Sequence, residues 1–164
     1  MEKKYISILV ANSEGVLARL SSLFCQRGFN IDSLTVSATN DPSLSRITIT
    51  TMGDEAELTQ IMRQTEKLHE FKGFFELKQN QALLRELLMV KVEASETNRS
   101  ALREIAAIYK AKIIDLSKSS MVFELTGEPE KLDAFLEILG TYDIMEVCRT
   151  GVTALQRGEV KLLK

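Results

Sequence analysis

Residues 12–36 read "NSEGVLARLSSLFCQRGFNIDSLTV" and place a glycine where a strand passes into a helix. Before this stretch, residues 5–10 alternate as a strand does, and Gly28 stands where a left-handed helix terminator is expected. Residues 34–39 then alternate apolar and hydroxyl side chains, as in a half-buried strand. Between the two strands the apolar residues follow a helical spacing: Val16, Leu17, Leu20, Leu23 and Phe24.

The pattern continues with a hairpin, a helix and a fourth strand. The breaker "NDPS" at 40–43 separates the strand at 34–39 from a second alternating strand around residues 47–49. Asp54, with Glu57 three residues later, has the spacing of a capping box and predicts the start of the second helix. A strand over residues 71–77 completes the order βαββαβ, in which two helices cover one face of a four-stranded antiparallel sheet.

The same order is then written a second time. Strands are expected at 87–94, 113–117, 121–126 and 144–149, with helices striped by residues 102–109 and opening at Pro129. The fold class is therefore α+β, with two tandem ferredoxin-like βαββαβ domains.

The polar run "KQNQ" at 78–81 predicts a boundary between domains 1–78 and 79–164, the second ending in an exposed tail at 157–164. Uncovered sheet faces and unpaired strand edges invite association, so we expect a homodimer.

Composition excludes several classes of protein. No apolar run approaches the roughly 20 residues of a membrane helix, and the first residues lack a signal peptide, so we expect a cytoplasmic protein. Residues 1–78 carry nine basic and ten acidic side chains, and residues 79–164 carry twelve and thirteen, which argues against a nucleic-acid partner. The two isolated cysteines, Cys25 and Cys148, are expected to be buried small hydrophobic residues.

Little in the sequence supports catalysis. The single histidine, His69, is expected at the end of the second helix and has no evident nucleophile to activate. No spacing of a metal site or a phosphate-binding loop is present, so no catalytic and no metal-ligating residue is predicted. An RNA-recognition domain needs stacking aromatics that "SRITITTM" at 45–52 lacks, and an acylphosphatase needs an arginine in the loop, whereas Arg19 lies one turn inside the helix.

The loop before the first helix has the character of a small-molecule site. Gly15 lets a ligand approach the backbone, and the free N–H groups of the first helical turn suit a carboxylate or phosphate. Asn30 adds an amide that both donates and accepts. An amino acid would satisfy both groups, although Gly15 easing a turn and Asn12 and Asn30 capping the backbone explain the residues equally well.

Several long segments together resemble one family. The segments "ILVANSEGVLARLSSLFCQRGFNIDSLTV", "DPSLSRITITTMGDE", "RELLMVKVEAS", "IIDLSKSS", "GEPEKLDAFLEIL" and "EVCRTGVTALQRG" occur in order over nearly the whole chain. They resemble the regulatory (small) subunit of bacterial acetohydroxyacid synthase (AHAS), also called acetolactate synthase. The resemblance implies an N-terminal ACT domain and a C-terminal ACT-like domain.

The resemblance also implies a site and its ligand. Valine, the end product of the pathway, is expected to bind between the ACT domains of two subunits and to cause feedback inhibition. Apolar contacts from Val16 and Ile31 would favour a branched side chain, whereas Glu14 stands where serine is common in the family. The expected effector-binding residues are Asn12, Glu14, Gly15, Val16 and Leu17 from one subunit and Asn30 and Ile31 from the other.

The implied role is regulatory. The small subunit would have no activity of its own; it would bind and activate the catalytic large subunit, with the second domain serving assembly. Thiamine diphosphate, FAD and magnesium would then be cofactors of that partner, with none in this chain. The alternative is a stand-alone ACT-type amino-acid sensor without a synthase partner.

Overall fold

The computed structural model describes residues 2–26 and 28–160. Residues 1, 27 and 161–164 lie outside the described residues. They include the first residue of the first predicted domain and the last four residues of the second, which belong to the predicted tail. The chain divides into two compact units. The first contains the residues up to Leu83 together with those from Gly151 onward, and the second contains Leu84–Thr150.

The first unit has the predicted βαββαβ order. Its strands form an antiparallel sheet in the order β2-β3-β1-β4, as expected of a ferredoxin-like domain. A short 3₁₀ helix occupies the predicted linker, at Gln79–Gln81. The main elements are β1 (Glu2–Ala11), α1 (Val16–Gln26), β2 (Ser33–Ala38), β3 (Leu44–Gly53), α2 (Glu55–Thr65) and β4 (Phe71–Glu76).

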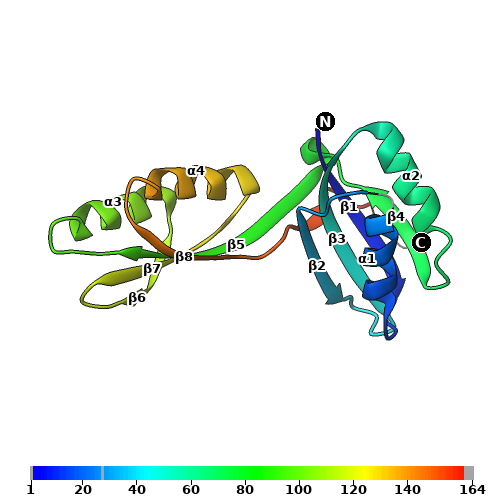
Figure 1. The fold of residues 1–164 in the computed structure, drawn as a ribbon, viewed down its shortest axis with the longest axis horizontal. Helices are drawn as coiled ribbons and strands as arrows, with labels where there is room; N and C mark the ends of the chain where they lie inside the picture. The colour runs from blue at the N-terminus through cyan, green and yellow to red at the C-terminus, as the bar shows by residue number, and fades with distance from the viewer. Residues whose placement is uncertain (1, 27, 161–164) are drawn as a thin grey trace. The chain divides into compact units, whose positions relative to one another are not determined.

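Both helices of this unit lie on one face of the sheet (Figure 1). They cover Ile6, Ile8, Ile47 and Ile49, which are fully buried, and each such side chain contributes about 1.5–3 kcal/mol of transfer free energy. The apolar stripe of α1 is narrower than predicted, because Leu17 is 38% exposed. The buried residues of the two helices are Val16, Leu20, Phe24, Leu58, Ile61 and Thr65.

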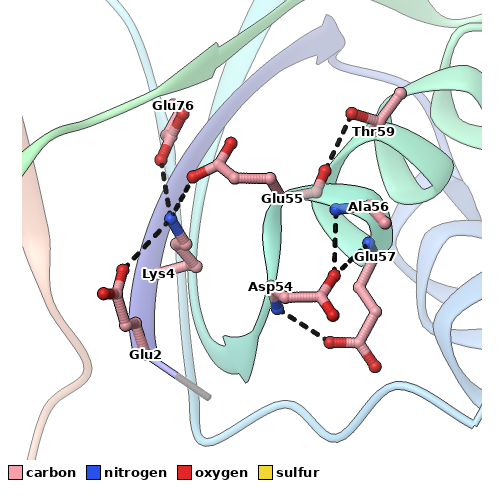
Figure 2. Close-up of polar contacts among 8 residues, drawn as sticks. All are labelled: Glu2, Lys4, Asp54, Glu55, Ala56, Glu57, Thr59 and Glu76. Atoms are coloured by element: carbon pink, nitrogen blue, oxygen red, sulfur yellow. Dashed lines mark hydrogen bonds and ion pairs between the residues drawn. The ribbon is translucent and has the colours of Figure 1, made fainter.

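The predicted start of α2 and the predicted end of α1 are confirmed. Asp54 accepts hydrogen bonds from the N–H groups of Ala56 and Glu57, and Glu57 accepts one from the Asp54 N–H, which completes the capping box (Figure 2). Gly28 follows α1 with φ of 73°, and its N–H donates to the Cys25 carbonyl. A left-handed glycine at this position is the usual helix terminator.

The opposite face of the first sheet is also covered. Tyr5, Ser7 and Leu9 point away from the helices, yet they are almost completely buried. The chain from Gly151 returns to this unit and forms β9 (Thr153–Gln156), which pairs with β5, and its Val152 and Ala154 are buried. The chain beyond Thr150 therefore folds with the first unit and not, as predicted, with the second.

This difference has a physical reason. A half-buried strand pattern on the outward face of the sheet needs a cover, but the pattern does not say which segment supplies it. The unit boundary falls at residues 83–84, slightly beyond the predicted run at 78–81. Residues 157–160 are exposed, as expected of the tail.

The second unit repeats the order of the first. Its sheet has the order β6-β7-β5-β8, and its two helices cover one face, where Leu88, Val90, Phe123 and Phe135 are fully buried (Figure 1). The elements are β5 (Ala82–Glu93), which begins in the first unit, α3 (Arg99–Tyr109), β6 (Lys112–Leu116), β7 (Ser120–Gly127), α4 (Pro129–Leu139) and β8 (Ile144–Arg149).

Both cysteines are exposed, so the prediction that they are buried is wrong. Cys25 follows Phe24 on α1 and lies off the buried stripe. Cys148 pairs with Met89 across strands on the face of the second sheet that the helices leave open.

No helix in the described part of the chain is long and apolar enough to cross a membrane.

A buried ion-pair cluster in the second unit was not visible in the sequence. The Arg149 Nε donates to Glu86 Oε2 at 2.7 Å, and its Nη1 donates to Asp133 Oδ1 at 2.5 Å. The Glu86 side chain is only 6% exposed. Arg149 therefore connects β5, β8 and α4 through one guanidinium group.

Candidate functional site

The loop before α1 presents a backbone that suits an anion. Gly15 has φ of 74°, in the left-handed region that favours glycine. The first turn of α1 contains no acidic residue, whereas α2 begins with Glu55 and Glu57 and is capped by Asp54. The first N–H groups of a helix have no partner within it and carry a partial positive charge. The start of α1 can therefore accept a carboxylate without competition from side chains of its own first turn.

Arg19 holds this loop in place. Its Nη2 donates to the Glu14 carbonyl at 3.2 Å and forms an ion pair with Glu70, whose own carbonyl accepts from the Ala11 N–H at 2.7 Å. A Cβ on Gly15 would lie 3.1 Å from Arg19 Nη1. Sequence reasoning placed Arg19 outside the loop and missed this role, although its position four residues after Gly15 puts it on the same side of the helix.

Of the remaining loop residues, Asn12 makes hydrogen bonds to the protein, the Val16 side chain is buried and Leu17 is exposed. Asn12 donates from Nδ2 to the Pro42 carbonyl at 3.1 Å, and its N–H donates to the Ser43 carbonyl at 2.7 Å. Asn12 therefore ties the loop to the β2–β3 hairpin. The Val16 side chain is buried in the core of its own unit, and the Val16 N–H donates to the Ser13 carbonyl at 3.5 Å, while Leu17 is exposed.

Asn30 and Ile31 lie beyond the other end of α1. Asn30 donates from Nδ2 to Asp32 at 3.2 Å, and its carbonyl accepts from Thr51 Oγ1 at 2.6 Å. Ile31 is half-buried against the core. Because a helix of 11 residues is about 16 Å long, one chain does not bring Asn30 to Gly15. The predicted site residues therefore lie in two separate groups in each chain.

An ion-pair cluster around Lys4 in the first unit is structural (Figure 2). Lys4 Nζ contacts Glu55 at 2.5 Å, Glu76 at 3.4 Å and Glu2 at 3.6 Å. The hydrogen bond to Glu55 raises the pKa of Lys4 above its ordinary value, against the opposing effect of desolvation. An ammonium group already lies among these carboxylates, so the cluster joins α2 to β1 and β4.

The described residues contain no group of three metal-ligating side chains. His69 is exposed and lies beyond the end of α2 at Thr65, so it is in a loop and not, as predicted, at the helix end.

Acid is expected to loosen the loop before α1. A hydrogen bond from its own N–H and the ion pair with Arg19 lower the pKa of the Glu70 carboxyl, against desolvation. A carboxyl with a lowered folded-state pKa stabilises the protein above its unfolded pKa of about 4.3, and this is lost as pH falls through the folded value. Amide exchange at residues 12–16, corrected for intrinsic rates, should therefore accelerate below about pH 4.

Glu70→Gln is the control for this prediction. It should show fast exchange in the same loop at every pH, because its side chain cannot ionise. Equal pH dependence in the variant and the natural protein would show that Glu70 does not hold the loop.

Comparison with known proteins defines the class. Residues 6–71 match the ACT domain described as AHAS small subunit-like, and residues 85–158 match the family described as the small subunit of acetolactate synthase. The loop and the fold of the first unit are thus those of an ACT domain.

Two acetolactate synthase small subunits are similar to this chain over nearly its whole length. The chain is 43% identical over 158 residues to the acetolactate synthase isozyme 3 small subunit of Escherichia coli K12, which covers 96% of this chain and 97% of that protein. It is 42% identical to the acetolactate synthase small subunit of Mycolicibacterium smegmatis, over 93% of this chain and 90% of that one.

A solved structure is also similar. The acetolactate synthase small subunit of Thermotoga maritima superposes with a TM-score of 0.89 at 33% identity and covers 98% of this chain and 100% of its own. The protein belongs to the family of acetolactate synthase small subunits.

Proposed function

We propose that this protein activates the thiamine-diphosphate-dependent large subunit of acetolactate synthase and makes it sensitive to feedback inhibition by valine. It has no catalytic activity of its own, and it acts in the cytoplasm. Thiamine diphosphate, FAD and magnesium belong to the catalytic partner. The observation that carries the proposal is the start of α1 in an ACT domain, which follows a left-handed glycine and has no acidic residue in its first turn, joined to a second unit that matches the small-subunit family.

The edge strand β2 offers a way to join the two halves of the site. β2 lies at the edge of the first sheet, and Ser33 at its start pairs with Thr50, while Ala38 at its end pairs with Ser45. Asn30 precedes the start of β2, and the hairpin bonded to Asn12 follows its end. If two copies pair their β2 strands antiparallel about a two-fold axis, the start of one strand lies beside the end of the other.

This homodimer would place Asn30 and Ile31 of one protomer near the loop from Asn12 to Leu17 of its partner. The carboxylate of valine would bind the N–H groups at Gly15–Leu17, and Asn30 would fix the amino acid across the interface. Val36, which is 42% exposed on β2, would be covered by the second copy. Valine then lowers activity because it binds the less active arrangement of the complex more tightly than the active one.

Calorimetric titration of the purified protein with valine tests this proposal. Saturable binding is expected, together with inhibition of the complex with the large subunit. Asn30→Ala should weaken binding about 10-fold or more, because hydrogen bonds to a charged ligand contribute about 1.5–3 kcal/mol. Leucine, isoleucine and histidine are compared in the same titration.

Asn80→Ala is the matched control, since Asn80 is an exposed asparagine in the 3₁₀ helix of the same unit. It should bind valine as the natural protein does. The proposal fails if neither the isolated protein nor its complex with the large subunit binds valine, and if saturating valine leaves the activity of that complex unchanged.

The alternative, a stand-alone amino-acid sensor, predicts a different result. Such a sensor would bind valine but leave the activity of acetolactate synthase unchanged. The match of residues 85–158 to the small-subunit family favours the synthase partner. That second unit supplies the surface that we assign to assembly with the large subunit.

A further inference from the structure

The C-terminal segment, defined here as residues 151–156, is bonded to the edge of the first sheet. Thr35 Oγ1 on β2 donates to the Val152 carbonyl at 2.7 Å. Arg46 Nη1 on the neighbouring strand β3 donates to the Ala154 carbonyl at 3.2 Å. The segment lies on the face of the sheet opposite α1 and α2, and it accepts both bonds through its main chain.

Gly151 sets how closely the segment approaches β2. A Cβ on Gly151 would lie 3.1 Å from the Cβ and Oγ atoms of Ser33 and 3.1 Å from Thr35 Cγ2. Gly151 does not have a positive φ, so an alanine there would meet no backbone strain. An alanine there would require the Ser33 and Thr35 side chains or the C-terminal segment to shift by a few tenths of an ångström.

The layer between the segment and the sheet is polar and incompletely bonded. Within residues 2–26 and 28–160, the buried hydroxyl groups of Ser7, Ser33 and Thr50 have no hydrogen-bond partner. Unpaired buried hydroxyl groups add no attraction and carry a desolvation cost. The segment is thus held to β2 by a few specific contacts, and a small shift of β2 changes them at low cost.

The contact between β2 and Gly151 lies next to two different parts of the chain, the residues Asn30 and Ile31 before β2 and the second unit before Gly151. Asn30 and Ile31 lie just before Ser33, and the Asp32 N–H donates to the Thr50 carbonyl at 2.9 Å. On the other side, Gly151 directly follows Thr150, the last residue of the second unit. A change at Asn30 therefore reaches the chain that enters the second unit through one strand and one hydrogen bond.

We propose that Thr35 and Gly151 are positioning residues that couple effector occupancy at Asn30 and Ile31 to the second unit. In this mechanism the ligand moves β2, and the contacts of Thr35 and Gly151 pass that movement to the C-terminal segment. The inference rests on the proposed function, because it needs an effector at Asn30. The coupling adds to the proposed function a route by which binding in one unit alters the other unit.

Thr35→Val tests the coupling, because valine keeps the shape of threonine and removes the hydroxyl donor. In the complete complex with the catalytic subunit, the dissociation constant for valine should stay within about 3-fold of the natural value. The activity that remains at saturating valine should rise by about 2- to 30-fold, which is the range measured for residues that carry coupling between sites. Ser37→Ala, at an exposed residue on the same face of β2, should change neither quantity.

Gly151→Ala provides the second variant, and amide exchange provides a second readout. In the natural protein, valine should slow exchange both at residues 12–17 and at residues 151–156. Both variants should keep the first response and lose the second. Normal inhibition in both variants, or a parallel loss of binding and inhibition, would overturn the coupling.

The same experiment separates the two hypotheses. A natural protein that binds no valine, alone or in the complex, refutes the proposed function. A natural protein that binds valine and is inhibited, with variants that behave as it does, refutes only the coupling through Thr35 and Gly151.

Discussion

Replacing Arg149 by methionine is expected to lower the free energy of unfolding of the second unit by about 3–5 kcal/mol, because the substitution leaves a buried charge without its partner. The Glu86 carboxylate is 6% exposed and accepts from Arg149 Nε at 2.7 Å. Methionine can fill much of the space but cannot donate. Urea unfolding followed by circular dichroism, with native-state amide exchange in β7, would measure the loss in this unit.

Two variants show whether the buried charge is the cause. Arg149→Met combined with Glu86→Leu should recover most of the lost stability, since an apolar pair can replace a buried ion pair at little cost. Lys91→Met removes an exposed ion pair with Glu146, whose side chain is 70% exposed, and should change stability by less than about 1 kcal/mol. An equal loss in Arg149→Met and Lys91→Met would show that Glu86 is not desolvated.

The features that the sequence predicted correctly are set by neighbouring residues. The capping box of Asp54 and Glu57 joins residues three apart, and Gly28 ends α1 through its own backbone conformation. The alternating strands and striped helices follow from the same short-range periodicity. The repeated βαββαβ order could therefore be predicted, because each element is specified within its own 5–12 residues.

The features that the sequence did not predict depend on distant contacts. Arg19 and Glu70 are 51 residues apart, and Thr35 and Val152 are 117 apart. The sequence shows that the outward face of the first sheet is partly apolar, but it does not say that the chain after Thr150 returns to cover it. The exposure of Cys148 likewise depends on which face of a sheet the helices cover.

In the candidate site, too, the local features could be predicted from the sequence and the features that depend on distant contacts could not. The Gly15 loop is local, and the turn expected there has a left-handed glycine. The distance between this loop and Asn30 depends on the tertiary fold, and so does the burial of the Val16 side chain. In the proposed function a second copy of the chain joins the two groups of residues, and the pairing of β2 is a prediction.

Gly15→Asp is expected to weaken valine binding by about 100-fold or more. Two carboxylates about 4 Å apart repel by roughly 4 kcal/mol at the effective dielectric constant near a protein surface. The substitution also places a side chain at φ of 74°, which costs about 1–2 kcal/mol, and its Cβ would lie 3.1 Å from Arg19 Nη1. Calorimetric titration measures the affinity, and a native circular dichroism spectrum with cooperative thermal unfolding, at a somewhat lowered Tm, would show that the fold is kept.

Mixed dimers of Gly15→Asp and Asn30→Ala decide whether the site is shared between subunits. The two variants, co-expressed with different affinity tags, are purified as the heterodimer on both tags. In a two-fold dimer with shared sites, one site then carries both substitutions and the other carries neither, so the heterodimer should bind valine at about half the natural stoichiometry and with natural affinity. If each site lay within one chain, both sites would carry a substitution and the heterodimer would bind as weakly as its parents. Restored binding would therefore place Gly15 and Asn30 on opposite sides of one interface.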